Sequence, residues 1–231
     1  MRNVTSPLIT AVCVLAIAGC TSPEPTAQDP TPAVTTTTEA TTPAAPGSEA
    51  PATIMLPPTA WQGAGPDGAR EDTPGVVAWR VPESCGAGSP ADGSAMRTVT
   101  QGSRELESSV GVHQVLVLAD ADVAVAEANR LTAALTACAE QASADGGTYV
   151  VEPLAVGAQG IGLAVDYYGA SAQGPLDEAI GTYLAITRRG NAVTLVAVDG
   201  GEGTVGTARQ TVTANAQTAW ELLCGYDSAG C

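Results

Sequence analysis

A long tract without core-forming residues limits where this chain can fold. From Thr21 to about Pro58 the sequence is almost entirely Thr, Pro, Ala, Ser and Glu, and it includes the threonine run Thr35–Thr38. Such a composition cannot bury enough apolar surface to offset the loss of conformational entropy. We therefore expect residues 20–58 to be a disordered tether, extended by its prolines. Residues 59–231 are enough for one domain with a hydrophobic core.

The residues before this tract are typical of an export signal. A short polar start with one cation, Arg2, is followed by an apolar run from Leu8 to Ile17. This run is shorter than the roughly 20 residues that a membrane-spanning helix needs, so we expect it to be removed after export. The sequence Ile17-Ala18-Gly19-Cys20 resembles a bacterial lipobox, whose cysteine is acylated. It predicts a signal peptide at residues 1–19 and a lipid anchor on Cys20 at the extracytoplasmic face of the cell membrane.

The charge of the chain argues against nucleic acid as a partner. The formal net charge is −15 and the sequence contains no lysine, so no basic surface is available to neutralise a phosphate backbone. The acidity is explained most simply by solubility at a polyanionic surface. We expect the partners to be the membrane, through the lipid anchor, and a small molecule, wall component or envelope protein.

Four cysteines remain for the domain once Cys13 leaves with the signal and Cys20 is acylated. An even number of cysteines in an exported domain predicts two disulfides, for which three pairings exist. A metal site is disfavoured because the four have no CxxC spacing and the chain has one histidine. The four are Cys85, Cys138, Cys224 and Cys231.

Hydrophobic patterning predicts an α+β domain. Cap-type residues at Asp120 and Asp122 and the apolar stripe Leu131, Leu135, Cys138, Ala142 predict a helix that ends at Gly146-Gly147. A second helix is expected from about Thr204 to Leu223, and Gly190-Asn191 is expected to form a type II′ hairpin turn. We expect an antiparallel sheet with both helices packed on one face. The predicted strands are Val76–Val81, Met96–Thr100, Val110–Leu118, Thr148–Leu154, Ile161–Tyr168, Tyr183–Thr187 and Ala192–Val198.

The order of these elements resembles the PknH-like extracellular sensor domain of actinobacterial surface lipoproteins and receptor kinases. The matching features are residues Ala128–Cys138, the hairpin through Arg188-Arg189-Gly190-Asn191, and the last helix, which ends Trp220-Glu221-Leu222-Leu223-Cys224. The resemblance implies a disulfide-bonded sensor-like fold, a cleft proposed to bind a ligand, and no enzymatic activity. It transfers no ligand residue to a position of this chain. Together with the place of Cys138 on the buried stripe, the resemblance favours the pairs Cys85–Cys138 and Cys224–Cys231.

Motifs for cofactor binding and nucleophilic catalysis are weak. The segment Gly201–Gly206 spells G-x-G-x-x-G, but the strand before it belongs to an antiparallel hairpin and no parallel strand follows, so we interpret it as a turn with Thr204 capping a helix. There is no G-x-S-x-G, and His113 lies in an apolar strand, where a buried structural role is expected. We expect no cofactor, no metal and no catalytic residue.

Two hypotheses from different classes remain. The first is a non-catalytic surface module that binds a ligand, for which Trp61, Trp79, Tyr167 and Tyr168 are the candidate contacts, although the two tryptophans fit a core role better. The second is an envelope hydrolase that uses Glu152 and Asp166, which lie on strands expected to be neighbours. Paired carboxylates at the floor of a pocket would favour the hydrolase, and an apolar cleft with a polar rim would favour the binding module.

Overall fold

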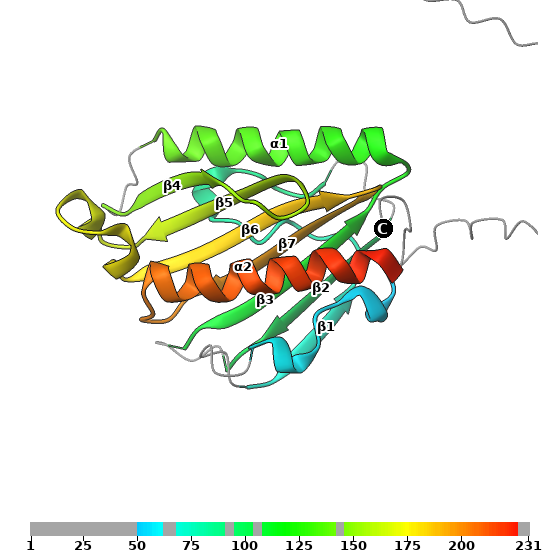
Figure 1. The fold of residues 1–231 in the computed structure, drawn as a ribbon, viewed down its shortest axis with the longest axis horizontal. Helices are drawn as coiled ribbons and strands as arrows, with labels where there is room; N and C mark the ends of the chain where they lie inside the picture. Colours follow the sequence, from blue (N-terminus) through cyan, green and yellow to red (C-terminus); the bar gives the residue numbers. More distant parts are fainter. Residues whose placement is uncertain (1–49, 62–67, 91–94, 104–107, 142–145, 226–231) are drawn as a thin grey trace, which may run out of the picture. The chain divides into compact units, whose positions relative to one another are not determined.

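One antiparallel sheet of seven strands organises the domain (Figure 1). The computed structural model describes residues 50–61, 68–90, 95–103, 108–141 and 146–225, all within one compact unit, Pro43–Cys231. The strand order is β1-β2-β3-β7-β6-β5-β4, and each neighbouring pair is antiparallel, as predicted. The strands are β1 Arg70–Pro74, β2 Ala95–Gln101, β3 Val110–Val117, β4 Thr148–Pro153, β5 Ala158–Asp166, β6 Gly181–Arg189 and β7 Ala192–Asp199.

Two α-helices begin at the predicted cap residues. Helix α1 spans Ala121–Ala139, and Asp120 Oδ1 accepts a hydrogen bond from Val123 N at 2.9 Å. Helix α2 spans Val205–Leu222, and Thr204 Oγ1 accepts from Thr207 N at 3.3 Å. Neither helix is both long and apolar enough to cross a membrane, within the described ranges. Short 3₁₀ helices complete the fold: η1 Ala52–Ile54, η2 Pro58–Trp61, η3 Glu83–Cys85, η4 Ala170–Ala172, η5 Leu176–Glu178 and η6 Leu223–Gly225.

The two helices cover opposite faces of the sheet, so the prediction that both pack on one face is wrong. Leu184 of β6 and Leu195 of β7 belong to the core cluster that contains α1. Their chain neighbours Tyr183 and Val196 belong to the cluster that contains residues of α2. Helix α2 lies in front of the sheet in Figure 1. Successive side chains of a strand point to opposite faces. Because the central strands are apolar on both faces, each face requires its own cover.

The segment Val77–Gly88, which we call the strap, crosses the α1 face without forming a strand. A strand was predicted at Val76–Val81, and this prediction is wrong. The chain leaves the sheet at Gly75, whose φ is 105°, and Trp79 N donates to Gly88 O at 3.0 Å, so the strap folds back on itself. The edge strand β1, which precedes it, was not predicted, because most of its residues are polar or charged and exposed.

The folded domain includes residues that were assigned to the tether. Ala50, Ile54 and Leu56 each expose 1% of their surface or less. Ile54 packs with Val115 of β3 in a core cluster on the α2 face. Backbone groups here are also bonded to the domain, since Arg97 Nε donates to Ala50 O at 2.7 Å. The domain therefore begins before Thr59, and the predicted boundary at residue 58 lies too far along the chain.

One disulfide bond, Cys85–Cys138, is present among the described residues, where two were predicted for the whole chain. It joins η3 of the strap to the last turn of α1, as the resemblance implied. Cys224 lies in η6. Its predicted partner Cys231, like Ala142 of the helix stripe, lies outside the described residues, so the second pair stays a prediction.

Candidate functional site

Two cavities flank the strap on the face that α1 covers. One, the β1 cavity, has a volume of about 550 Å³ and is lined by the strap and by residues of β1 and β2, including Thr98 and Thr100. The other, the β6 cavity, has a volume of about 370 Å³ and is lined by the strap and by the ends of β5, β6 and β7. Both are within the size range of small-molecule sites. The strap residues Arg80–Glu83 line both cavities and so form the wall between them.

A buried glutamine on β3 holds the first half of the strap. Gln114 is fully buried. Its Oε1 accepts from Arg80 N at 2.7 Å, and its Nε2 donates to Ala78 O and to Thr98 Oγ1, both at 3.1 Å. Trp79 Nε1 donates to Glu127 of α1 at 2.8 Å. The side-chain amide thus replaces the ladder bonds that a strand would supply, and it fixes the backbone of Arg80.

The second half of the strap is attached to α1 and β4. Besides the Cys85–Cys138 bond, Arg130 Nη1 donates to Ala87 O at 2.6 Å, and Ser84 Oγ lies 2.9 Å from Tyr149 Oη. A disulfide and several hydrogen bonds therefore hold an irregular segment in one conformation. The cavity walls formed by the strap are preorganised, which reduces the entropic cost of binding.

Arg80 stands apart from the other described arginines. Each of the others donates a hydrogen bond from its guanidinium group to a described residue. These arginines are Arg70, Arg97, Arg130, Arg188, Arg189 and Arg209. Arg80 is exposed, and its guanidinium makes no hydrogen bond or ion pair with any residue in the described ranges. A cation with a fixed backbone and an open side chain thus lies between two cavities.

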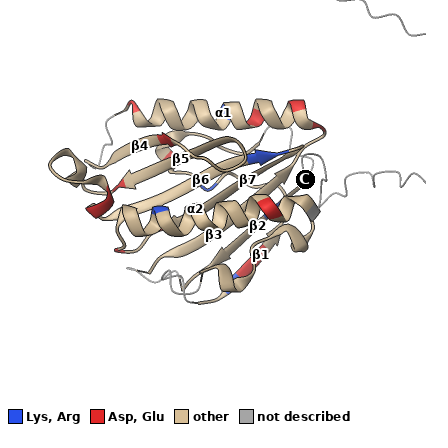
Figure 2. Ribbon diagram, viewed as in Figure 1, with Lys and Arg blue, Asp and Glu red and all other residues tan. Residues whose placement is uncertain are grey.

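Two acidic side chains share the β6 cavity with Arg80. Glu83 comes from the strap and Asp199 from the end of β7, and both are exposed. Within the described part of the chain, neither carboxylate makes a hydrogen bond or an ion pair. On the ribbon as a whole, charged residues are sparse and acids predominate (Figure 2). The β6 cavity therefore combines groups of both signs that are not neutralised by one another.

The four aromatic candidates fall into two groups. Trp79 lines the β1 cavity and Tyr167 lines the β6 cavity. Trp61 has no exposed surface and lies on the α2 face, where a Cβ on Gly111 would come within 2.5 Å of its ring. Tyr168 is 73% exposed and meets Tyr167 edge to face at 6.4 Å, but it lines neither cavity. Trp61 is a core residue, and the cavities contain one candidate each.

The two acids of the hydrolase hypothesis do not come together. Glu152 pairs with Gly162 and Asp166 with Thr148, so they lie four positions apart along β4 and β5, which is roughly 13 Å at the usual rise per residue. Asp166 is fully buried. Burial raises its pKa, but hydrogen bonds from Ser171 and Tyr168 outweigh this effect and the pKa is lowered. Asp166 thereby fixes the loop after β5.

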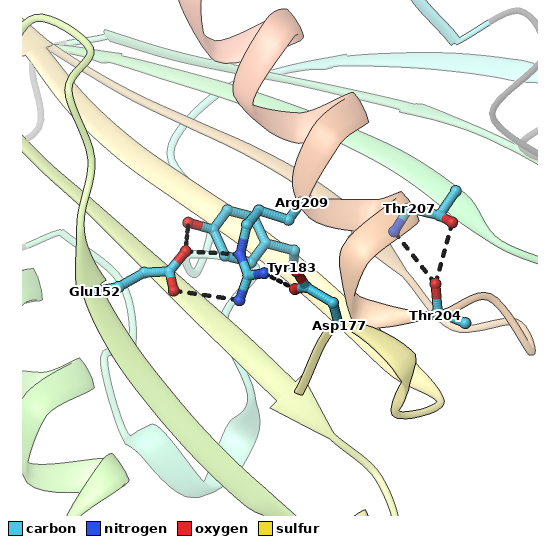
Figure 3. Close-up of polar contacts among 6 residues, drawn as sticks. All are labelled: Glu152, Asp177, Tyr183, Thr204, Thr207 and Arg209. Carbon is cyan, nitrogen blue, oxygen red and sulfur yellow. Dashed lines mark hydrogen bonds and ion pairs between the residues drawn. The ribbon is translucent and has the colours of Figure 1, made fainter. Parts of the chain in front are cut away.

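Glu152 is instead part of a polar cluster beneath α2 (Figure 3). Its Oε1 accepts from Tyr183 Oη at 2.7 Å and from Arg209 Nε at 2.8 Å, and its Oε2 accepts from Arg209 Nη2 at 3.2 Å. Arg209 also donates to Asp177 of η5. Burial and the Glu152 carboxylate raise the pKa of Tyr183. Every charged group of the cluster has a partner, so it connects α2 to the sheet and leaves Glu152 no open acid for catalysis.

His113 and the glycine-rich segment both have the structural roles that were expected. His113 is fully buried in β3; its Nδ1 accepts from Leu56 N at 3.0 Å and its Nε2 lies 3.0 Å from Thr194 Oγ1. The segment Gly201–Gly206 follows β7, whose neighbours β3 and β6 are both antiparallel to it. It turns the chain into the Thr204 cap of α2. No βαβ unit surrounds it.

Sequence reasoning missed Arg80, Glu83, Asp199 and Gln114. Gln114 carried a signal, because a polar side chain in the apolar run of β3 must find a buried partner. The three charged residues carried no signal in the sequence, since they come together only because the strap passes the end of β7. Cys20, the predicted lipid site, lies outside the described residues.

Comparisons with known proteins leave the family open. No family model and no curated protein matches the chain. Among solved structures, the crystal structure of the extracellular domain of PknH from Mycobacterium tuberculosis is similar, with a TM-score of 0.49 and 13% identity over 73% of this chain and 93% of that chain. A likeness of this extent carries no inference about function. Membership of the PknH-like family, to which the order of elements pointed, therefore stays a prediction.

Proposed function

We propose that this chain is a membrane-anchored extracytoplasmic lipoprotein whose folded domain binds a ligand in the cavities beside the strap. The ligand is a small molecule, a wall fragment or a segment of an envelope protein. The observation that carries the proposal is the strap itself: it is fixed on both sides, and it presents to two cavities the Arg80 guanidinium, which has no partner among the described residues. Backbone held in place without regular structure, beside open polar groups, is typical of binding sites.

The anchoring half of the proposal rests on the sequence Ile17–Cys20. Acyl chains on Cys20 would hold the protein at the membrane, since each buried methylene adds to the affinity. Expression in a bacterium that processes lipoproteins tests this step. The wild-type chain should label with radioactive palmitate and partition into the detergent phase. Cys20→Ser should abolish the label and release the protein to the medium, whereas equal membrane retention of the variant would exclude the anchor.

The positions of Glu152 and Asp166 favour ligand binding over the hydrolase alternative. Glu152 is bonded to Arg209 on the α2 face, and Asp166 is bonded within its own loop. Glycosidase carboxylates stand about 5 to 9.5 Å apart across a cleft, a geometry that these two residues do not have. An enzyme of this kind would therefore need other acids of the chain.

A peptidoglycan digest that contains soluble disaccharide peptides is the probe for this half. We expect the detergent-solubilised full chain to bind components of the digest and to release no new products from it. Ala78→Trp fills the β1 cavity, because Ala78 is an exposed residue of its lining, and Thr182→Trp fills the β6 cavity. At least one of the two should abolish binding. Binding that survives both variants, or turnover of the digest, would refute the proposal.

A further inference from the structure

The charges that line the β6 cavity restrict the kind of ligand that it can accept. Arg80 contributes one positive charge, and Glu83 and Asp199 contribute one negative charge each. Arg80 and Glu83 are three residues apart in the strap, yet they form no ion pair. Asp166 also lines the cavity, but Ser171 and Tyr168 occupy its oxygens. The cavity is thus lined by three charged side chains of both signs that have no hydrogen-bonding partner among the described residues, and by the hydrogen-bonded Asp166 carboxylate.

A ligand with charge of one sign does not match this arrangement. A simple anion would pair with Arg80 but would be repelled by Glu83 and Asp199. A simple cation would pair with the two acids and be repelled by Arg80. Complementary potentials determine which partner an interface accepts, and juxtaposed like charges exclude the wrong one. A ligand that carries both an anionic and a cationic group satisfies all three residues.

The remaining lining of the β6 cavity suits a small polar molecule with a short apolar part. Tyr149, Tyr167 and Thr182 bring hydroxyl groups, and Leu184 and Ala197 give an apolar floor. Burial raises the pKa of Tyr167, which keeps this hydroxyl a neutral donor and acceptor. A volume of about 370 Å³ is at the lower end of the range for ligand pockets.

We infer that the β6 cavity binds a zwitterionic ligand of the amino-acid or short-peptide class, with its carboxylate on Arg80 and its ammonium group on Asp199 and Glu83. The carboxylate and the planar guanidinium match as a bidentate pair. The inference rests on the proposed binding function and specifies the ligand class.

Three forms of one dipeptide test the inference by titration calorimetry with the full chain. Alanyl-alanine is a zwitterion, its N-acetyl form is an anion and its C-terminal amide is a cation. Since hydrogen bonds to charged groups are the strong ones, we expect each blocked form to bind about 10- to 100-fold more weakly than the zwitterion. In Arg80→Gln the amide should bind at least as tightly as the free dipeptide. In Asp199→Asn, N-acetylation of the dipeptide should reduce its affinity less than it does for the wild-type chain.

Arg97→Gln is the matched control, because Arg97 is paired with Asp72 and lines neither cavity. It removes the same charge and should leave the order of the three ligands unchanged. If Arg80 has only a structural role, Arg80→Gln should weaken the binding of all three ligands equally, and this result would overturn the inference. It would also be overturned if the wild-type chain bound the amide as tightly as the free dipeptide. If no dipeptide binds but the peptidoglycan digest does, the zwitterion inference fails and the proposed function stands. If neither binds, both fail.

Discussion

Protonation of His113 should destabilise the domain at mildly acidic pH. The imidazole is fully buried, and because its Nδ1 accepts the Leu56 N–H, the ring proton lies on Nε2 and is donated to Thr194 Oγ1. A second proton on Nδ1 would face the N–H of Leu56. Burial, and secondly the charge of Arg70, lower the pKa of His113 from 6.5 to about 3. The folded state therefore keeps the ring neutral at a pH where the unfolded chain binds a proton.

The direction and size of the effect follow from this difference in pKa. Above pH 6.5 neither state is protonated, so stability is complete; below it only the unfolded state gains a proton, until the folded pKa near 3 is reached. Each pH unit in this window costs about 1.4 kcal/mol, so the domain should lose about 2 kcal/mol of unfolding free energy between pH 7 and pH 5. Carboxylates with ordinary pKa values remain largely ionised there.

Urea unfolding of the full chain at pH 7, 6 and 5 measures this loss. His113→Asn is the control: its side-chain oxygen can replace Nδ1 as the acceptor for Leu56 N, and its stability should be nearly constant over the same range, although lower at pH 7. Since the chain has one histidine, its NMR signal is unambiguous and should not titrate between pH 7 and pH 4.5. A flat wild-type profile, or a titration near pH 6.5 in the folded protein, would refute the reasoning.

Three further variants test the structure. Replacing Cys85 and Cys138 together by alanine should lower the unfolding free energy by about 4 kcal/mol by the loop-entropy model, given their separation of 53 residues; a loss below about 1 kcal/mol in urea denaturation would contradict the strap's attachment. Gly111→Ala places a methyl group 2.5 Å from the Trp61 ring and should lower the unfolding free energy by about 1 to 3 kcal/mol. An unchanged melting temperature would contradict this prediction. Glu152→Gln removes the charge partner of Arg209, whose side chain is 24% exposed, and should cost about 1 kcal/mol of unfolding free energy. The difference from the wild type should shrink in 1 M salt, and a difference that is absent at low salt would contradict a stabilising ion pair.

Local patterns determined much of this fold. The runs around His113 and Val196 have β-branched, apolar residues and became central strands β3 and β7. Asp120 and Thr204 capped the helices as predicted, because a short polar side chain before an amphipathic stretch satisfies free N–H groups. Gly190 adopts the positive φ, 51°, that its hairpin turn requires.

Other features depend on contacts distant in sequence and were not predictable in the same way. β1 is polar because it is an edge, so it lacks the alternation that marks a buried strand. The opposite placement of the helices followed from apolar side chains on both faces of the central strands. The candidate site depends on Arg80 and Asp199, which are brought to one cavity by the strap and by the pairing of β7. No local sequence pattern predicts that these two residues line the same cavity.

Hydrogen exchange with the peptidoglycan digest tests the central claim most directly. Mass spectrometry of the full chain, with and without the digest, reports which backbone amides become protected. We predict slower exchange in the strap, Val77–Gly88, and at the start of β6, with no change in residues 50–61 on the α2 face. Protection confined to the α2 face, or no protection at any concentration of the digest, would contradict a ligand site beside the strap.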